Sequence, residues 1–376
     1  MNKKLHILFL CGWYPSRVLP TNGDFIERHA KAVSKKHKVT VLHIITDKNL
    51  KNDLEVISKE KNNITTNIAY IRNTKNPLKK ALLFRKALFT LLKLTGNFDV
   101  VHLNEIYPFG SFSLYLKWFQ QKPFIISEHF TGYHLPQAKT LSFTEKIISR
   151  IITKNATFVC PVSNNLKDAL LNLNYKGNYV SVPNVVDTSL FYPLEKEIST
   201  FTITHVSNML NTHKNVEGLL NVVKKLEDKI DNFKVKLIGE NANRYIEYAK
   251  KNNLDTSNIE FINQIPHLAV VSELQNSNLF VLFSNYENLP CVILESFSCG
   301  IPVISTNVGG INEFFPKDFG FLIPAKDENA LLENILKVYK NFKTDKTKMH
   351  NYVIENFSED KIASNFENLY FKSLKS

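Results

Sequence analysis

The chain alternates short apolar runs with longer amphipathic segments, and this alternation restricts its fold more than any other feature. Residues 5–12, 38–45 and 98–104 have the length and the β-branched or aromatic content of buried strands. Between them, residues 23–37 and 76–94 carry apolar side chains at helical spacing. Strands that alternate with helices form parallel sheets through right-handed βαβ connections. The sequence therefore predicts an α/β protein.

The alternation stops once and then restarts, which indicates two domains. Residues 183–200 contain two prolines and lack periodicity, as linkers do. A chain of 376 residues is also longer than one hydrophobic core usually grows. We expect two Rossmann-like, doubly wound parallel-sheet domains, residues 1–185 and 186–357, and a helix at about 358–376 that packs back on the first. Two further segments are interpreted locally, residues 63–73 as a strand or hairpin and residues 178–187 as a strand entering a loop.

The formal net charge of +12 leaves several kinds of partner open. A positive surplus suits nucleic acid, anionic lipid or an anionic substrate, and also a lysine-rich surface that binds nothing. Lys146, Arg150 and Lys154 recur every four residues, so they share one helical face. Together with the basic, apolar segment 76–94, this pattern favours docking on an anionic membrane, with ordinary solvated charge as the alternative.

Other features point to a cytoplasmic protein, peripheral at the inner face of the membrane. The longest apolar runs are far shorter than the roughly 20 residues that span a bilayer. The basic start is followed by a short apolar stretch ending in Gly-Trp-Tyr-Pro, which favours a buried first strand over a signal peptide. The four cysteines are far apart and lack a Cys-x-x-Cys pair, so we expect buried free thiols in a reducing compartment and no zinc site.

Residues 285–310 carry the strongest functional pattern. Glu287 and Glu295 flank a helix start at Asn288–Pro290, where proline is favoured in the first turn. A helix N-terminus attracts anions, and in open α/β sheets ligands bind at the carboxyl ends of strands. Carboxylates instead bind sugar hydroxyls through charge-assisted hydrogen bonds. A nucleotide sugar, which carries phosphate between two sugars, satisfies both features.

The segment from Glu287 to Phe314 resembles the Glu-x7-Glu signature of retaining glycosyltransferases of the GT4-type group, which has the GT-B fold. The resemblance spans nearly the whole chain and implies two domains that face each other across a cleft. The first would bind the acceptor and the second the nucleotide-sugar donor. Other family-like segments follow in the family's order, namely residues 11–30, 101–104, 127–132, 182–187 and 206–220.

The resemblance also implies roles for individual residues. Glu287 and His129 would be catalytic, with Glu287 near the reacting carbon and His129 near the donor sugar and acceptor. Glu295 would hold the ribose, and Lys214 would neutralise the leaving diphosphate. Each also has a structural alternative: a helix-dipole partner for Glu287, solvent-facing charges for Glu295 and Lys214, and a strand-end histidine for His129.

Further donor-binding roles follow from the same resemblance. The amides around Asn288, Leu289 and Pro290 would face the sugar or diphosphate, and Gly23 would allow close approach of the first domain's loop. Two positions depart from the family pattern. Asn208 stands where the family has a diphosphate-binding arginine, for which Arg17 and Arg28 are candidate replacements, and Gly23 is followed by Asp where many relatives have Gly-Gly. Gly309-Gly310 are interpreted either as cleft residues or as a simple turn.

We therefore expect a retaining transfer of sugar from a nucleoside diphosphate to a hydroxyl of a glycan or lipid-linked acceptor. Cell-surface polysaccharide or glycolipid synthesis is the expected context. No metal or cofactor is expected, because no Asp-x-Asp motif follows an apolar strand. A sugar-nucleotide epimerase of the same fold and a basic nucleic-acid- or membrane-binding protein are the alternatives. A nicotinamide dehydrogenase is disfavoured because G-x-G-x-x-G does not follow the first strand, and no nucleic-acid-binding motif is found.

Overall fold

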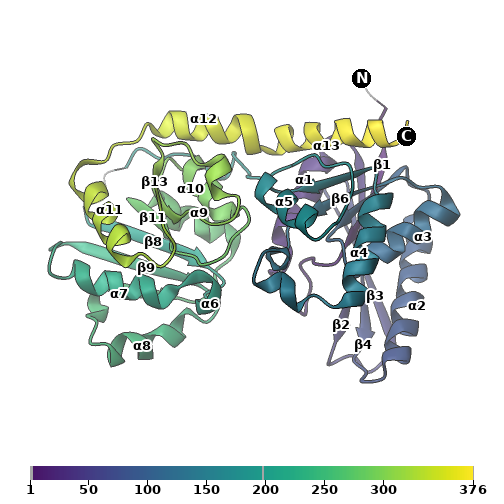
Figure 1. The fold of residues 1–376 in the computed structure, drawn as a ribbon, viewed down its shortest axis with the longest axis horizontal. Helices are drawn as coiled ribbons and strands as arrows, with labels where there is room; N and C mark the ends of the chain where they lie inside the picture. Colours follow the sequence, from purple (N-terminus) through teal and green to yellow (C-terminus); the bar gives the residue numbers. More distant parts are fainter. Residues whose placement is uncertain (1–2, 197–198, 376) are drawn as a thin grey trace. The chain divides into compact units, whose positions relative to one another are not determined.

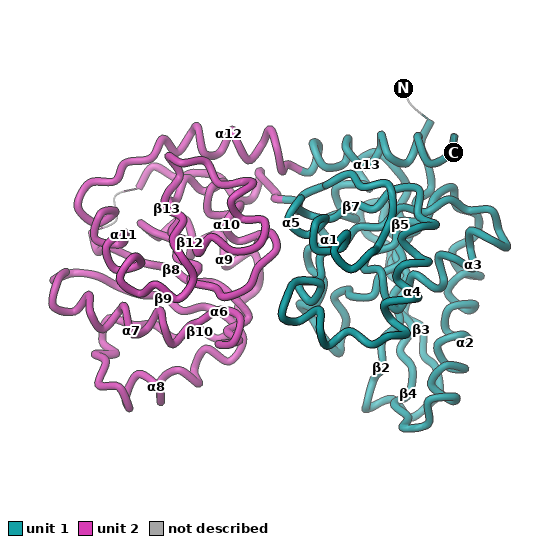
Figure 2. The backbone as a smooth tube through the Cα atoms, viewed as in Figure 1, with its two compact units in different colours: residues 1–185, 359–376 teal, residues 186–358 magenta. Residues whose placement is uncertain are grey.

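A computed structural model describes residues 3–196 and 199–375, which form two compact units (Figures 1 and 2). Unit 1 comprises residues 1–185 and 359–376, and unit 2 comprises residues 186–358. Each unit is built on its own sheet, in which nearly all strands run parallel. This arrangement confirms the prediction of two Rossmann-like α/β domains.

The sheet of unit 1 has the strand order β3-β4-β2-β1-β5-β6-β7. All neighbouring strands are parallel except β3, which pairs antiparallel with β4 at the edge. The strands are β1 (His6–Cys11), β2 (Lys38–Asp47), β3 (Leu54–Lys61), β4 (Ile64–Arg72), β5 (Val100–Asn104), β6 (Phe124–Glu128) and β7 (Phe158–Pro161). The helices are α1 (Asp24–Ser34), α2 (Pro77–Thr95), α3 (Gly110–Gln120), α4 (Phe143–Asn155), α5 (Asn164–Asn172) and α13 (Glu359–Ser373).

The sheet of unit 2 has the order β10-β9-β8-β11-β12-β13, and its paired strands are all parallel. The strands are β8 (Phe201–Ser207), β9 (Phe233–Gly239), β10 (Ile259–Ile262), β11 (Leu279–Leu282), β12 (Val303–Thr306) and β13 (Gly320–Ile323). The helices are α6 (Asn211–Lys214), α7 (Val216–Leu226), α8 (Tyr245–Lys251), α9 (His267–Gln275), α10 (Cys291–Ser298), α11 (Glu328–Asn341) and α12 (Lys346–Phe357).

Local chemistry explains where many of these elements begin and end. The Asn76 side chain caps α2 by accepting hydrogen bonds from the backbone of Leu78 and Lys79, at 3.0 and 3.1 Å, and Pro77 fills the first helical position. Central strands such as β5 and β6 are buried along their whole length, as parallel strands covered on both faces must be. Their continuous apolar runs made them recognisable in the sequence.

The last helix, α13, belongs to unit 1 although the chain reaches it after completing unit 2 (Figure 2). Ile362 and Phe366 join the same core as Phe9 of β1. The Tyr370 hydroxyl lies 2.6 Å from Nδ1 of His102, so the buried histidine of β5 has a partner on the C-terminal helix. Burial of its apolar face therefore holds the end of the chain on unit 1.

Some elements differ from the sequence-based predictions. Residues 178–187 form no strand; Tyr179 makes only an isolated bridge to Val159, and Pro183 has no N–H for a ladder. Residues 64–72 are one strand of a hairpin with β3, which the prediction did not include. The edge strand β3 is largely solvent-accessible and therefore lacks a marked apolar pattern. Four more elements were not predicted, namely α3, α11, α12 and β13.

Candidate active site

The segment that holds the two glutamates leaves the carboxyl end of β11 and enters α10. Pro290 is the residue just before the helix, and Gly300 follows it with φ of 71°, the left-handed conformation expected of a helix end. Glu287 is 8% exposed and Glu295 is 3% exposed. Neither carboxylate is therefore a solvent-facing surface charge, and each needs compensation within the protein.

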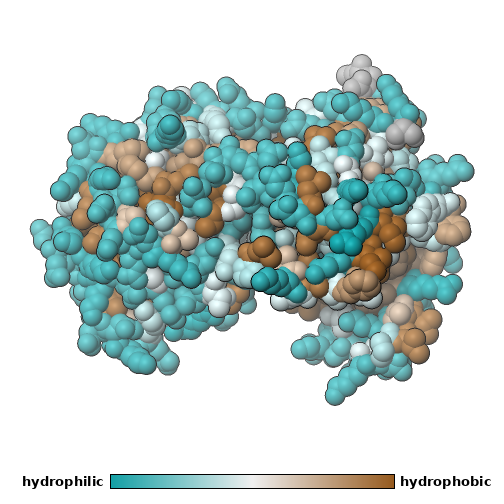
Figure 3. Space-filling view, viewed as in Figure 1, coloured by the Kyte–Doolittle hydropathy of each residue, from teal (hydrophilic) through white to brown (hydrophobic). Residues whose placement is uncertain are grey.

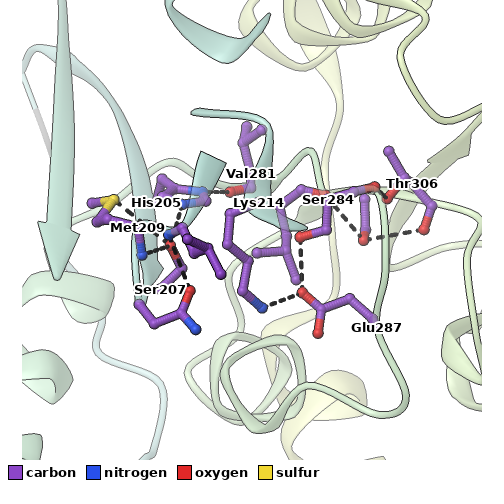
Figure 4. Close-up of polar contacts among 12 residues, drawn as sticks. His205, Ser207, Met209, Lys214, Val281, Ser284, Glu287 and Thr306 are labelled. Carbon is purple, nitrogen blue, oxygen red and sulfur yellow. Dashed lines mark hydrogen bonds and ion pairs between the residues drawn. The ribbon is translucent and has the colours of Figure 1, made fainter. Parts of the chain in front are cut away.

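Lys214 and Ser284 compensate Glu287. The Lys214 ammonium forms an ion pair with Oε1 of Glu287, and the Ser284 hydroxyl donates to the same oxygen at 2.8 Å (Figure 4). Lys214 ends the short helix α6, which follows β8, whereas Ser284 and Glu287 follow β11. Because β8 and β11 are neighbours in the sheet, their carboxyl ends bring these side chains together. The structure thus joins two of the residues that the sequence singled out.

The backbone around Glu287 is fixed from two sides. On one side, Asn285 donates its backbone N–H to His213 O at 2.6 Å. On the other, Gly310 donates to Asn288 O at 2.9 Å, and Gly309 adopts φ of 61°. A Cβ at Gly309 would lie 2.0 Å from the carbonyl oxygen of Glu287. The Gly-Gly turn therefore permits the close approach that sets the position of Glu287.

Glu295 has a different partner. Its Oε1 lies 2.8 Å from Nε2 of His267, the first residue of α9. The His267 ring packs against Phe191, with ring centres 5.0 Å apart. Sequence reasoning missed His267, and its one available signal was its position after β10, at the start of a helix. The two glutamates are thus held by separate groups.

The loop after β8 contains Asn208 and lies next to Lys214 in sequence. The Asn208 side chain accepts a hydrogen bond from the backbone of Leu210 at 3.2 Å, so it shapes its own turn. Beneath it, His205 is buried between Val281 O and the Ser207 hydroxyl, at 2.9 and 2.8 Å. Burial lowers the pKa of His205 to about 4, so this ring is neutral.

A cation that the sequence analysis did not consider also reaches this loop. Arg244, in the turn before α8, donates to the carbonyl oxygen of Met209. The Tyr245 hydroxyl donates to the same oxygen at 2.6 Å. No sequence motif marks Arg244, because its relation to the loop depends on the pairing of β9 with β8.

In unit 1, the two candidate replacements for the family's arginine are already paired. Arg17 makes ion pairs with Asp47 and Glu55, at 3.0 and 2.6 Å, and Arg28 pairs with Asp24 at 2.5 Å. Both guanidinium groups are therefore compensated by carboxylates of their own unit.

Gly23 has a structural reason to be glycine. It precedes α1 with φ of 76°, and a Cβ there would lie 2.6 Å from the backbone carbon of Trp13. This close approach within the chain is enough to require glycine, whatever else the loop binds.

His129 follows β6 and lies among aromatic rings. Its ring centre is 4.6 Å from that of Phe25 and 5.3 Å from that of His29. Burial, assisted by His29 and His102, holds the pKa of His129 well below its ordinary value. The imidazole is therefore neutral, which leaves it able to accept a proton or a hydrogen bond.

Two buried acids beside His129 were not anticipated. The Glu128 carboxylate accepts backbone hydrogen bonds from Ile106, His129 and Phe130, at 2.9, 2.8 and 2.8 Å. Burial raises the pKa of Glu128 to about 7, and these hydrogen bonds oppose the rise. Burial and the neighbouring Glu128 raise the pKa of Glu105 to about 9. Each follows an apolar strand, which was the available signal.

Among residues 3–196 and 199–375, no helix combines the length and apolar content needed to cross a membrane. All four cysteines are free thiols; Cys11, Cys160 and Cys299 are buried, and Cys291 is half-buried.

Comparison with protein families gives matches over both units. The family described as "Glycosyltransferase Family 4" matches residues 25–190, and that described as "Glycosyl transferases group 1" matches residues 195–358. The chain is 22% identical over 364 residues to the putative teichuronic acid biosynthesis glycosyltransferase TuaC of Bacillus subtilis, covering 89% of each chain. It is 29% identical over 198 residues to a phosphatidylinositol N-acetylglucosaminyltransferase of Arabidopsis thaliana, covering 52% of this chain and 44% of that protein. The chain thus spans about half the length of the first curated relatives it matches.

Solved structures share the fold at low identity. Sucrose-phosphate synthase from Thermosynechococcus elongatus superposes with a TM-score of 0.78 at 20% identity, over 98% of this chain and 99% of that one. Anabaena HepE in complex with UDP and glucose gives 0.75 at 15% identity, over 98% and 100%. The two family matches together take in most of the sequence, and the sheets of both units agree with this fold. The chain therefore belongs to the GT4-type glycosyltransferases, which have the GT-B fold.

Proposed function

We propose that the chain transfers a sugar from a nucleoside diphosphate to a hydroxyl of a glycan or lipid-linked acceptor, with retention of configuration. The contact between Lys214 and Glu287 at the carboxyl ends of β8 and β11 carries this proposal. It puts a cation and a sugar-binding carboxylate at one place, as a sugar diphosphate requires. The names of TuaC and the phosphatidylinositol enzyme support a context in cell-surface polysaccharide or glycolipid synthesis.

The donor would be held by groups of unit 2. Glu295, positioned by His267, would accept hydrogen bonds from the ribose hydroxyls. The backbone around Asn288, Leu289 and Pro290, at the start of α10, would face the diphosphate. HepE binds UDP, which supports a uridine nucleotide as the first donor to test.

Lys214 would act on the leaving group. With donor bound, the sugar hydroxyls would become hydrogen-bond partners of Glu287, and the Lys214 ammonium would turn to the diphosphate. Charge that develops on the leaving phosphate would then meet a cation already held in place. Attack from the same face, with that phosphate accepting the acceptor's proton, would retain the configuration and needs no protein nucleophile or divalent metal. His129, a neutral imidazole, would lie near the acceptor.

Unit 1 is proposed to bind an anionic membrane at the inner face of the plasma membrane. On α4, Phe143, Ile147 and Ile151 are 76%, 38% and 42% exposed and repeat every four residues. Lys146 and Lys154 lie on the same helix. Figure 3 shows hydrophobic residues beside hydrophilic ones over the part of unit 1 that carries α4 in Figure 1. Apolar side chains flanked by cations suit an anionic lipid surface.

A thermal-shift screen against UDP, GDP, ADP and their sugars tests the donor, followed by transfer assays with and without a glycan acceptor. We expect stabilisation by one nucleotide and turnover that depends on acceptor. A folded sample that responds to no nucleotide would count against a glycosyltransferase. Interconversion of the nucleotide sugar without any acceptor would instead identify an epimerase.

A further inference from the structure

We infer that an anionic sugar of the acceptor binds in a cavity of unit 1, between the loop after β1 and the carboxyl end of β2. This inference rests on the proposed glycosyl transfer and names the chemistry of its acceptor. The cavity has a volume of about 1140 Å³, and all its lining residues lie between Gly12 and Glu55. Its lining therefore includes none of the residues around Glu287, and its volume is large enough for a sugar residue and more.

The position of the cavity in the sheet suits a binding site. β1 and β2 are parallel neighbours, and Cys11 at the end of β1 is paired with His43. The chain leaves β1 for Gly12 and Trp13, whereas β2 continues to Asp47 before it turns. Ligands of open α/β sheets bind at the carboxyl ends of the strands.

The wall of the cavity carries a rigid array of hydrogen-bonding groups. Arg17 donates to Asp47 from Nε at 3.0 Å and to both oxygens of Glu55, at 2.6 and 3.0 Å. The guanidinium carbon lies 3.9 Å from the centre of the Tyr70 ring, which fixes its plane. These bonds use three of the five N–H donors of the guanidinium. A hydroxyl both donates and accepts, so a polyhydroxylated ligand matches an arginine flanked by carboxylates.

His43 supplies the strongest single observation. It lines the cavity, is 1% exposed, and its Nδ1 lies 3.0 Å from Cys11 O. Because a carbonyl only accepts, Nδ1 must carry the proton. Burial lowers the pKa of His43 to about 4, so the ring is neutral and Nε2 is an acceptor. Within the described part of the chain, Nε2 has no hydrogen-bond partner. A buried acceptor without a partner is rare, and a ligand hydroxyl would satisfy it.

Charge at the rim selects an anionic sugar. Inside the cavity, Asp47 and Glu55 already compensate Arg17. Lys48 and Lys51 are exposed lining residues in the turn after β2, and neither makes an ion pair with any residue in 3–196 or 199–375. Two uncompensated cations above a hydroxyl-binding wall fit a sugar that carries a carboxylate or a phosphate.

Saturation-transfer NMR on the full chain can compare glucose, glucuronic acid and glucose 6-phosphate. We expect at least one anionic sugar to bind more tightly than glucose, and the tighter of the two identifies the anion. The double variant Lys48→Met/Lys51→Met should weaken anionic-sugar binding about threefold or more and leave glucose unaffected. The matched control Lys59→Met/Lys61→Met, on the exposed part of β3, should change neither.

His43 gives a second readout. His43→Leu should weaken all three sugars, because it removes the acceptor, and His43→Gln should retain more binding. Equal binding of glucose and both anionic sugars, or equal effects of the two lysine pairs, would overturn the inference. If UDP still stabilises the chain and Glu287 is still needed for turnover, only the cavity assignment fails. If no nucleotide binds, the proposed function fails instead.

Discussion

Lys214 and Glu287 form a buried ion pair across 73 positions of sequence, at the carboxyl ends of the neighbouring strands β8 and β11. The side chains are 15% and 8% exposed, so water screens the pair little. The pair therefore has a structural role, compensation of a buried acid, and a proposed catalytic role. Variants can separate the two roles.

Lys214→Met should destabilise unit 2 by about 3–5 kcal/mol, because it leaves the Glu287 carboxylate buried without its cation. Urea unfolding measures this loss. The double variant Lys214→Met/Glu287→Gln should regain most of the stability, since no uncompensated charge remains, but should not regain transfer activity. Recovery of both would contradict a role for Lys214 beyond structure.

Glu295→Gln and Glu287→Gln should affect different kinetic parameters. Loss of a charged hydrogen-bond partner is worth about 1.5–3 kcal/mol, or roughly 10- to 100-fold. Glu295→Gln should weaken nucleotide binding by this factor in calorimetric titration. Glu287→Gln should mainly lower kcat, with nucleotide affinity little changed. Parent transfer rates in both variants would show that the donor lies elsewhere.

Gly309→Ala should reduce both stability and transfer rate. The residue has φ of 61°, and the added Cβ would lie 2.0 Å from Glu287 O. Gly96→Ala is the matched control, because Gly96 has φ of 71° but nothing lies within 4 Å of its Cβ position. The control should lose only about 1–2 kcal/mol, the usual penalty for a left-handed residue. Thermal unfolding should show a larger loss for Gly309→Ala, and only this variant should impair transfer.

Glu105→Gln should stabilise the protein increasingly as pH rises. The pKa of Glu105 is about 9 in the folded state, against an ordinary value of 4.5. Between these values the unfolded chain has lost its proton while the folded protein retains it, so parent stability falls with pH. Glutamine cannot ionise and avoids this loss. The Tm difference between variant and parent should grow from pH 5.5 to pH 8.5, and a constant difference would contradict a raised pKa.

Phe143→Ser/Ile147→Ser should lower partitioning onto anionic vesicles about tenfold or more, because two exposed apolar side chains leave the lipid surface. Sedimentation with phosphatidylglycerol vesicles measures this. Tyr339→Ser/Ile354→Ser is the control, since both residues are comparably exposed apolar residues of unit 2, at 43% and 40%. Equal loss in the two double variants would argue against α4 as the docking surface.

The sequence was sufficient for the features that local pattern encodes. Continuous apolar runs located the buried strands, and the position of Gly300 gave the end of α10. The spacing of Glu287 and Glu295 marked the segment in which both acids are buried. Pattern failed where burial is partial or pairing is absent. The edge strand β3 has a mostly solvent-accessible, charged sequence, and residues 178–187 have strand-like composition but no neighbouring strand to complete a ladder.

By itself, the sequence determined two α/β units and the candidate residues Glu287, Glu295 and Lys214. Only the tertiary structure decided which groups meet: Lys214 with Glu287, His267 with Glu295, and the free nitrogen of His43 with a cavity. The reason is physical, because side-chain periodicity reports burial along one element, whereas these contacts depend on the order of strands in each sheet. That order is set by long-range pairing, which local spacing does not record.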